Sequence, residues 1–569
     1  MLNTTTANPS AYASEALKSI INRAFAAAME KGELAKAEVP AFNIEIPGDR
    51  SHGDFSSNAA MVSARTFRMA PAKIAAAVIA HAELSGSPFC RCETAGPGFL
   101  NFFLSDKWFA DTVSAVLAGG ESYGRTGHGG GEKVMVEFVS ANPTGPMHLG
   151  NARGGTLGDC LAACLDASGH DVTREFYIND AGNQIERFSL SLEARYLQIY
   201  LGEDEVKVPE DGYQGADIIE RARGFAEIYG DRYVGAKPDE RRKALVEYAL
   251  PLNIEKMRAD LEKYRITYDV WFPESTLHSS GAVDDTISMF KERGLTYEKD
   301  GALWYKATEF GGEKDEVLVR KNGYPTYFAV DIAYHINKFV TRGFNRVINI
   351  WGADHHGHVA RLKGAMNAAG LDGSKLDIVL VQLVRTLSNG EIVRMSKRTG
   401  KAITLTNLIE EIPVDAARFF FDMREPGSSL DFDLELAAEQ SSQNPVYYVQ
   451  YAHARICSIL KNLAVSGIAT RDCAPEELLK LNAPEERELI FDLARFPAVI
   501  IEAADSYDPA LITRYLMDTA TLFHKFYNTC RVKGEDESIM QARIALCIAT
   551  RQVIANALKL IKVSAPSIM

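Results

Sequence analysis

The sequence is poor in cysteine and has no apolar run long enough to cross a membrane as a helix. Its eight cysteines are few for 569 residues, and the close pairs Cys90/Cys92 and Cys160/Cys164 lack the spacing of a zinc knuckle or a redox motif. The first residues also lack the basic start and apolar stretch of a secretory signal peptide. We therefore expect reduced thiols, a cytoplasmic location and no membrane partner.

Two common phosphate-binding motifs are absent as well. The chain contains no P-loop ending in Gly-Lys-Ser/Thr and no G-x-G-x-x-G fingerprint. These absences exclude an ordinary P-loop nucleoside triphosphatase and an obvious dinucleotide enzyme. The composition, with 46% hydrophobic and 24% charged residues, is typical of a globular protein. The length predicts three or more domains, at about 100–200 residues each.

Negative charge predominates, and the net charge of −13 argues weakly against a nucleic-acid partner. The distribution is uneven, because residues 511–569 contain eight Lys or Arg against four Asp or Glu, a net of +4. A basic segment can bind a polyanion locally, although the solvated face of a helix has the same composition. The acid-free stretch from residue 541 onward contains Arg543, Arg551, Lys559 and Lys562.

Three parts of the chain differ in pattern. Residues 1–116 mix an Ala-rich helix with strand-like runs, which predicts a small α+β domain, and the Gly-rich stretch 117–133 marks its end. Residues 117–414 alternate apolar strands with helices, which predicts a Rossmann-like parallel sheet covered on both faces. A charged helical segment at about 185–315 is predicted to be an insertion in this α/β domain. Residues 415–569 predict an all-α bundle.

Three stretches rich in polar residues fall at the carboxyl ends of predicted strands: ANPTGPMHLGN, GADHHGH and RMSKRTGKA. Ligands of open parallel sheets bind outside the carboxyl ends of the strands. A phosphoryl centre needs fixed donors and positive charge, which His148 beside Gly150 and Lys397 on a basic loop supply. Each piece alone also fits a structural turn or a basic surface loop, but their order along the chain favours a phosphate site.

The histidine-rich stretch GADHHGH could suggest a metal site. Three histidines within four positions cannot all point the same way, so we predict no protein metal site there. A role in handling ATP is the preferred interpretation, with Asp354 at a ribose hydroxyl and the histidines at phosphates or the base.

Two carboxylates, Glu137 and Asp331, lie in or at the end of apolar runs without an evident cationic partner. An unpaired buried charge costs several kcal/mol, in the range of about 3–5. A ligand guanidinium would satisfy both, because it is planar and forms bidentate pairs. The alternative is a salt bridge to an Arg or Lys elsewhere in the same chain.

Several stretches resemble class I aminoacyl-tRNA synthetases. ANPTGPMHLGN resembles their HIGH signature, and RMSKR resembles their KMSKS loop. Longer stretches resemble the arginyl-tRNA synthetase family in particular, and SHGDFSSNAAM resembles the N-terminal domain of that family. The resemblance spans nearly the whole chain. Its most specific segments are EFVSANPTGPMHLGNARGG, YINDAGNQIE, YPTYFAVDIAYHINKF, WGADHHGHVARLKGAM, NPVYYVQYAHARI and the final APSIM.

The resemblance implies that the chain joins L-arginine and ATP, with Mg²⁺, to give arginyl-adenylate and then transfers the arginine to the 3′ end of arginine tRNA. It implies that His148 and Lys397 steady the phosphates in the transition state. The further residues implied at ATP are Gly150, Asn151, Gly352, Asp354, Met395 and Ser396. The residues implied at arginine are Glu137, Tyr327 and Asp331 for the guanidinium, Asn142 for the α-amino end, and His355.

The resemblance also implies how the outer parts bind tRNA. The N-terminal domain would contact the tRNA elbow, and the helical C-terminal domain would bind the anticodon. Arg543, Arg551, Lys559 and Lys562 are then candidates for tRNA binding, and the enzyme is expected to be a monomer.

The chain departs from the family signatures at three positions. Asn151 replaces the second histidine of HIGH and can donate a hydrogen bond but carries no positive charge, while Arg394 and Arg398 replace the first lysine and last serine of KMSKS. Because Lys397 is retained, we expect an active enzyme. Two alternatives remain: an inactive paralogue that binds RNA, and a different adenylyl-transferring enzyme acting on a small acid. The retained site residues and the tRNA-binding ends argue against them.

Overall fold

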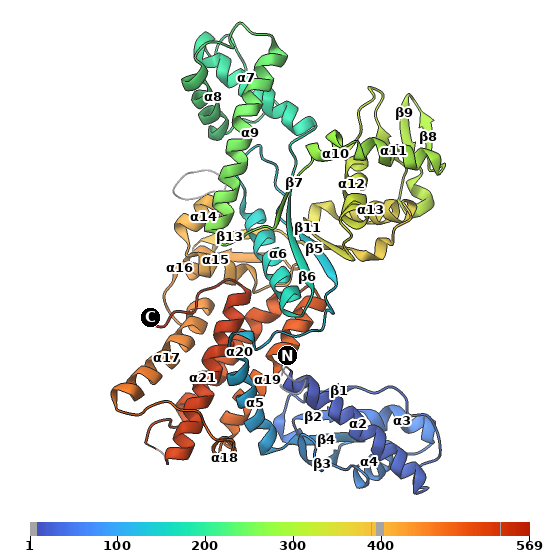
Figure 1. The fold of residues 1–569 in the computed structure, drawn as a ribbon, viewed down its shortest axis with the longest axis vertical. Coiled ribbons are helices and arrows are strands. Elements are labelled where there is room, and N and C mark those ends of the chain that lie inside the picture. The colour runs from blue at the N-terminus through green and yellow to red at the C-terminus, as the bar shows by residue number, and fades with distance from the viewer. Residues whose placement is uncertain (1–7, 389, 394–402, 535) are drawn as a thin grey trace.

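The computed structural model describes residues 8–388, 390–393, 403–534 and 536–569. Figure 1 shows a central α/β domain with a helical arm above it, a second lobe at its side, and an N-terminal domain and a helical bundle below. A central parallel sheet, an α+β N-terminal domain and a helical C-terminal part confirm the predicted fold class. Among the described residues, no helix is long and apolar enough to cross a membrane.

The central sheet has five parallel strands in the order β12-β11-β5-β6-β7. The chain moves outward from β5 through β6 to β7 and then crosses to β11 on the other side of β5. In open parallel sheets, ligands bind where the strand order reverses, which here is between β5 and β11. The strands are β5 (Lys133–Glu137), β6 (Asp171–Ile178), β7 (Val270–Pro273), β11 (Arg346–Gly352) and β12 (Leu376–Val381).

Helix α6 (Leu149–Ala167) follows β5 and packs closely on the segment that leaves this strand. A Cβ at Gly158 would lie only 2.4 Å from the ring of Phe138, so no larger residue fits there without displacing that ring. The residues from Ala152 to Ala162 are all buried. The small residues of ARGGTLGD are therefore explained by the close approach of α6 to the end of β5.

Strand β7 lies inside the segment predicted as a single insertion over about 185–315. Before β7, the helical arm has a hydrophobic core of its own around Phe188 and Phe225. After β7, short helices and a three-stranded antiparallel sheet form the side lobe. The structure thus has two inserted segments that flank one strand of the central sheet. Their elements are α7 (Asn183–Leu201), α8 (Ala216–Tyr229), α9 (Pro238–Lys263), α10 (Ser275–Ser279), α11 (Ala282–Glu292), β8 (Thr296–Lys299), β9 (Ala302–Tyr305) and β10 (Glu316–Val319).

The N-terminal domain pairs an antiparallel sheet, in the order β1-β2-β4-β3, with three helices. The next helix, α5 (Asp106–Gly119), leaves this domain and packs on the C-terminal bundle, where the Trp108 ring lies 5.9 Å from that of Phe491. Part of the predicted 1–116 unit therefore belongs to the bundle core. The domain consists of α2 (Pro9–Glu30), β1 (Ile44–Glu45), β2 (Phe55–Ser57), α3 (Ala59–Phe67), α4 (Pro71–Ala80), β3 (Phe89–Ala95) and β4 (Phe99–Leu104).

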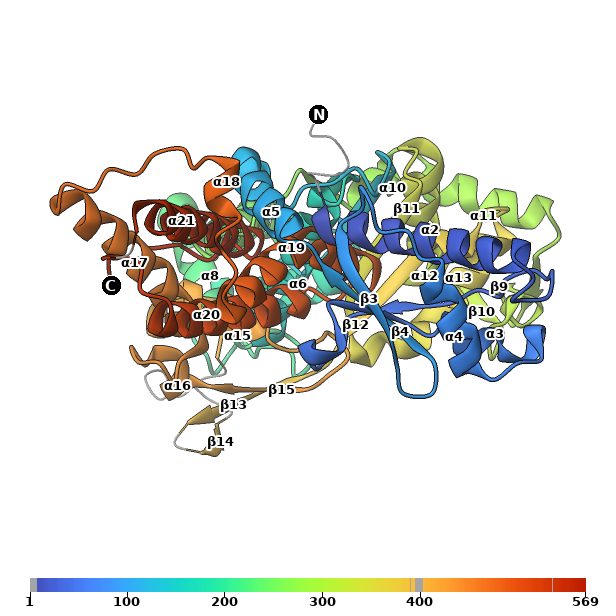
Figure 2. The same cartoon turned by 90° about the horizontal axis from the view of Figure 1, so that it is seen from below.

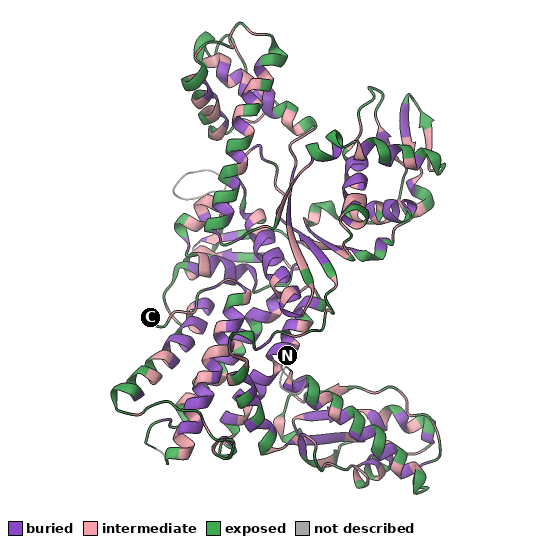
Figure 3. Ribbon diagram, in the orientation of Figure 1, coloured by how far each residue is buried: buried purple, intermediate pink, exposed green. Residues whose placement is uncertain are grey.

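The bundle and the N-terminal domain lie side by side, as the view from below shows (Figure 2). Buried residues concentrate in the centre of the bundle and on the inner faces around the central sheet, whereas the outer parts of the helical arm and side lobe carry many exposed residues (Figure 3). The bundle helices are α17 (Pro445–Val465), α18 (Pro475–Leu478), α19 (Pro484–Asp505), α20 (Ala510–Thr529) and α21 (Glu537–Leu560).

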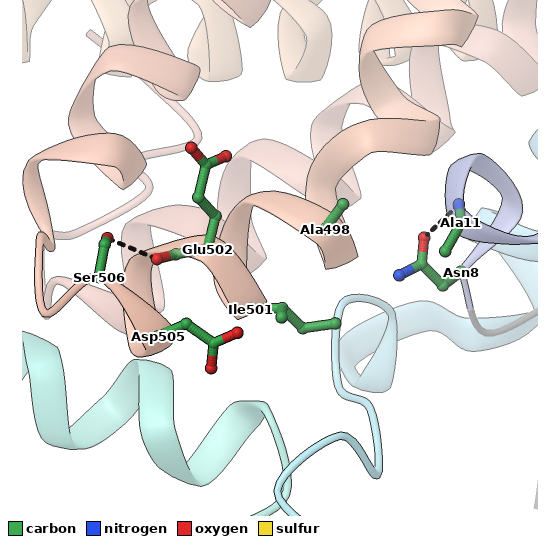
Figure 4. A pocket seen from close by; sticks show the side chains of 7 residues that line it. All are labelled: Asn8, Ala11, Ala498, Ile501, Glu502, Asp505 and Ser506. Carbon is green, nitrogen blue, oxygen red and sulfur yellow. Dashed lines mark hydrogen bonds between the residues drawn. The ribbon is translucent and has the colours of Figure 1, made fainter. Parts of the chain in front are cut away.

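A pocket lies where the start of α2 meets the end of α19 (Figure 4). None of its lining residues belongs to the central sheet, and its carboxylates disfavour an anionic ligand. It is a feature of how the N-terminal domain rests on the bundle. The lining residues are Asn8, Ala11, Ala498, Ile501, Glu502, Asp505 and Ser506.

A connecting region joins the sheet to the bundle through α14 (Leu405–Glu411), α15 (Val414–Phe421), α16 (Leu434–Ala438) and the small sheet of β13 (Val384–Ser388), β14 (Glu391–Val393) and β15 (Leu430–Asp433). Arg418 of α15 is fully buried and donates to Asp159 at 2.7 Å and to the carbonyl of Ile561 at 2.8 Å. Lys562 donates to the same carboxylate at 2.8 Å. Asp159, on α6, is thus linked to α15 by Arg418 and to the end of the bundle by Lys562, and Arg174 of β6 lies 3.6 Å from its carboxylate.

We expect Arg418→Met to destabilise the fold by about 3–5 kcal/mol, because the buried carboxylate of Asp159 would lose the nearest of its cationic partners. The matched control is Arg385→Met, since Arg385 and Asp431 form an exposed pair, for which we expect less than about 1 kcal/mol. Urea unfolding of the full chain measures both. Equal midpoints for the two variants would show that this seam does not depend on charge pairing.

Candidate active site

The histidine turn predicted from HLGN lies at the switch point, where the helix that follows β5 begins. His148 is the N-cap of α6, and its Nδ1 accepts a hydrogen bond of 3.1 Å from the amide of Gly150. A ring nitrogen that accepts from an amide carries no proton, so the proton of the neutral ring lies on Nε2. Partial burial lowers the pKa of His148, with Asp354 opposing the shift. At neutral pH, His148 therefore presents a neutral N–H donor.

Asn151 has a structural task at this turn. Its Oδ1 accepts a 3.0 Å hydrogen bond from the backbone amide of His148, which completes a capping box around the first turn of α6. Asn151, which replaces the second histidine of the HIGH signature, thus helps to hold the first one, His148, in place.

Glu137 has a cationic partner in the chain, so the premise that it lacks one is wrong. Its Oε2 accepts from Nζ of Lys338, which is fully buried, and its Oε1 accepts from the Ser140 hydroxyl at 2.9 Å. The alternative of a salt bridge within the chain is what the structure shows at this position. Lys338 was not apparent from the sequence because it lies 201 residues further along the chain.

Asp331 lies on helix α12 (Tyr327–Ile336), and its partner is a histidine. His358 Nε2 lies 2.9 Å from its Oδ2, and His358 Nδ1 accepts from Arg361 Nε at 2.6 Å. Because Nδ1 accepts, Nε2 carries the proton and donates to the carboxylate. A neutral donor leaves the negative charge of Asp331 uncancelled. His358 follows β11 on helix α13 (His356–Ala368), so part of GADHHGH serves this carboxylate.

A third carboxylate, Glu274, was missed by the sequence analysis. It directly follows β7, is 3% exposed, and accepts a 2.8 Å hydrogen bond from the Tyr177 hydroxyl. Burial raises the pKa of Glu274, and Asp331 raises it further. Its ion pair among the described residues is with His278, 3.6 Å away, and not with a lysine or arginine. Glu274 stands at the start of α10, which contacts the helix α12 that carries Asp331, so the two carboxylates could bind one cation together. Recognising β7 as a sheet strand would have revealed Glu274.

The other predicted arginine-binding residues lie around the same strand ends. Tyr327 begins α12, is 39% exposed, and has its hydroxyl beside Gly182 in the loop after β6. Asn142 and His355 are exposed, on the loops that follow β5 and β11.

The predicted ATP-binding residues divide into two groups. Gly352 and Asp354 lie where β11 ends and are exposed, and Asp354 is close enough to His148 to oppose the lowering of its pKa by burial. Met395, Ser396 and Lys397 lie outside the described residues. The chain that follows them returns to the histidine turn, because the amide of Leu405 donates to the carbonyl of Met147 at 2.9 Å. The described residues that follow the second signature segment thus lie beside the histidine turn.

Three of the four basic residues predicted to bind tRNA form ion pairs within the chain. Arg543 donates to Glu486 and to the carbonyl of Arg531, each at 2.7 Å, and Lys562 holds Asp159. Lys559 pairs with Glu121 across 3.3 Å on the surface, and Arg551 is half-buried.

An aromatic face that the sequence analysis missed lies on α17 and α20. Tyr451 is 42% exposed, and its ring centroid lies 6.0 Å from that of His524. The Arg455 guanidinium lies 4.4 Å from the centroid of the Tyr527 ring. Aromatic side chains interleaved with arginine are typical of surfaces that stack unpaired bases. This aromatic face consists of Tyr448, Tyr451, Arg455, His524 and Tyr527.

Family models match the three parts of the chain in succession. They are the arginyl tRNA synthetase N terminal domain over residues 15–104, the catalytic domain of tRNA synthetases class I (R) over 112–456, and the DALR anticodon binding domain over 449–569. The catalytic model alone covers more than half of the chain. Together with the histidine turn at the switch point, these matches define a class I aminoacyl-tRNA synthetase.

Similar proteins identify the family within this class. The chain is 54% identical to an arginine–tRNA ligase of Acetivibrio thermocellus, covering 97% of this chain and 98% of that protein. It is 55% identical to one of Caldanaerobacter subterraneus subsp. tengcongensis, covering 98% and 99%. The Thermus thermophilus arginyl-tRNA synthetase shares the fold, with a TM-score of 0.74 at 22% identity over 98% of this chain and 100% of that one. The chain belongs to the arginyl-tRNA synthetase family and is an arginine–tRNA ligase.

We expect His148 to titrate below an unstructured histidine, whose pKa is about 6.5, and to carry its proton on Nε2 at pH 7. Because the folded state lowers the pKa of His148, the unfolded state binds the proton more readily. The contribution of His148 to stability is therefore lost as pH falls below that unfolded value. Two-dimensional ¹⁵N–¹H spectra of histidine-labelled enzyme test this, with His148→Gln assigning the signal. A protonated His148 at pH 7 would contradict the assignment of a neutral donor.

Proposed function

We propose that this arginine–tRNA ligase forms arginyl-adenylate at the switch point between β5 and β11, as a monomer in the cytoplasm. The observation that carries the proposal is the meeting of two features at one edge of the sheet. One is the neutral histidine donor at the start of α6, and the other is the pair of carboxylates Glu274 and Asp331, whose helices α10 and α12 are in contact. An anion and a cation can therefore be bound side by side.

The arginine carboxylate attacks the α-phosphorus of ATP, which forms the acyl–phosphate bond and releases pyrophosphate. The carboxylate is already ionised, so the site needs no general base and acts by positioning and charge stabilisation. His148 Nε2–H and the amides at the start of α6 would bind phosphate oxygens. By their place in the second signature, Lys397 would steady the phosphates, and Met395 and Ser396 would bind ATP. Gly150 and Asn151 would shape the ATP site beside the turn, and Gly352 and Asp354 would contact the nucleoside.

Mg²⁺ would enter with ATP rather than be held by a protein cage. No group of three or more His, Cys, Asp or Glu side chains in the described part of the chain is arranged to hold a metal ion. Mg²⁺ commonly keeps several waters and binds substrate phosphates, and it would neutralise phosphate charge here. The residues present fit this mode, in which the polyphosphate supplies the ligands.

The guanidinium of arginine would bind Asp331 and Glu274, with Tyr327 closing one side of the site. Both carboxylates have neutral hydrogen-bond donors, His358 and Tyr177, so two negative charges face the guanidinium. Glu137 is already paired with Lys338, so it would support the site from behind rather than bind the guanidinium directly. Asn142 would bind the α-amino end of arginine, and His355 would lie at the same arginine site.

The tRNA would bind along the outer parts. The N-terminal domain would contact the elbow of the tRNA, and the aromatic face on α17 and α20 would stack anticodon bases. Arg551 and Lys559 remain candidates for phosphate contacts, whereas Arg543 and Lys562 are held by carboxylates of the chain.

We expect Glu274→Gln and Asp331→Asn each to raise the KM for arginine by an amount equivalent to about 1.5–3 kcal/mol, with the KM for ATP unchanged. The lost interaction in each case is a charge-assisted pair with the guanidinium. Aminoacylation kinetics with arginine tRNA measure the change. Asp377→Asn is the control, because Asp377 pairs with Arg346 at the opposite edge of the sheet. An arginine KM within twofold of wild type in both site variants would refute the assignment.

We expect Tyr451→Ala to weaken tRNA binding by about 1–3 kcal/mol, the range for loss of one base-stacking aromatic. The KM values for arginine and ATP should not change. The matched control is Tyr229→Ala on the helical arm, since Tyr229 is 38% exposed and Tyr451 42%. Fluorescence titration with arginine tRNA measures both variants, and equal affinities would exclude the aromatic face as the anticodon site.

A further inference from the structure

A buried chain of hydrogen bonds crosses the switch point behind the proposed arginine site. Lys338 lies near its centre, in the π-helical turn η4 (Asn337–Thr341) that extends α12. Its ammonium donates to Glu137 and to Asn349 Oδ1 at 3.1 Å, and it lies 4.1 Å from the centroid of the Tyr334 ring. Lys338 and Asn349 are fully buried. An ammonium with two acceptors and an aromatic face has a partner for each of its three N–H groups.

The chain of hydrogen bonds continues from Asn349 in a single direction. Asn349 Nδ2 lies 2.8 Å from His335 Nε2, and His335 Nδ1 lies 2.7 Å from the carbonyl oxygen of Asp331. Lys338 can only donate, so Asn349 Oδ1 accepts and its Nδ2 donates. His335 Nε2 must then accept, which leaves the proton on Nδ1 to donate to Asp331. Burial, together with the charge of Lys338, lowers the pKa of His335, which favours this neutral ring.

The chain of hydrogen bonds joins the three elements that form the proposed arginine site. Asp331, His335 and Lys338 follow one another at intervals of four and three, so they share one face of α12 and its π turn. Glu137 ends β5, and Asn349 lies in β11. The chain therefore fastens the helix that carries Tyr327 and Asp331 to both strands at the switch point. π-helical turns within α-helices are frequent at functional sites.

We propose that Lys338 and Asn349 are positioning residues for arginine: they set Asp331 relative to β5 and β11, and Lys338 keeps Glu137 occupied so that the guanidinium binds Asp331 and Glu274 alone. This inference rests on the proposed place of Asp331 in the arginine site. It goes beyond it in naming what holds Asp331 there. Neither residue touches the substrate, so both act through Asp331 and Glu137.

The test separates positioning from mere support of the fold. Asn349→Leu removes the central link, keeps a similar volume, and leaves the pair of Lys338 with Glu137. We expect the KM for arginine to rise about tenfold or more and the KM for ATP to stay within about twofold, because small misplacements of a binding group weaken a productive complex. The matched control is Tyr334→Phe on the same helix, α12. It removes the buried hydrogen bond from Tyr334 to Glu175 but keeps the ring beside Lys338. The control should lower the melting temperature without changing the KM for arginine.

Two further variants keep the proposal testable if Asn349→Leu does not fold. Asn349→Asp keeps the size and the contact with Lys338 but cannot donate to His335, and it should raise the KM for arginine in the same way. The double variant Glu137→Gln with Lys338→Met removes both charges together and leaves no unpaired buried ion. Combined with Asn349→Leu, its effect on the KM for arginine should be less than additive, since both interrupt one chain.

The outcomes distinguish this inference from the proposed function. If Asp331→Asn raises the KM for arginine but the Asn349 variants leave it within twofold, positioning by this chain is overturned and the arginine site stands. If Asp331→Asn itself has no effect while the enzyme still charges tRNA with arginine, the proposed site fails, and this inference fails with it. A matching rise in the KM for arginine in Tyr334→Phe would show that any buried polar loss on α12 acts alike, which would also overturn the proposal.

Discussion

The reversal of strand order between β5 and β11 is the constraint on which the rest of the site depends. Parallel strands end at one edge of a sheet, and a reversal sends their connections to opposite faces, leaving a crevice between them. Helix α6 lies on one side of the sheet, and α12 and α13 lie on the other (Figure 1). The turn proposed to bind phosphate and the carboxylates proposed to bind the guanidinium are thereby brought to one end of the sheet, although the chain between them forms two large inserted segments.

The parts of the site that could be predicted are those written in consecutive residues. The turn around His148 and the apolar strand before it are local patterns, and Asp331 stands out because it interrupts an apolar run. Glu274 could not be recognised, since β7 has four residues inside a charged segment whose helical periodicity hides it. The pairing of Glu137 with Lys338 could not be predicted from sequence patterns either, because a sequence shows which charged residues exist but not which of them pair after folding.

The C-terminal part shows the same limit for surface charge. Its basic residues suggested an electrostatic contact with RNA, yet Arg543 and Lys562 are held by Glu486 and Asp159 within the fold. Charge that is cancelled inside the molecule contributes little to attraction at a distance. The aromatic face on α17 and α20 was less visible, because its members come from two helices and are ordinary bundle residues in each. Composition counts cations, whereas recognition depends on which of them remain accessible.

The docking of α5 into the bundle has a consequence for synthesis of the chain. The Tyr123 hydroxyl, just beyond α5, bonds to the carbonyl of Leu493, a separation of 370 residues. Contacts this distant close large loops and form late. Because chains emerge N-terminus first, α5 leaves the ribosome long before α19 and α21 exist to cover its apolar face. The nascent chain therefore exposes the apolar face of α5 through most of its translation. We expect chaperones that bind exposed apolar surfaces to bind it during synthesis.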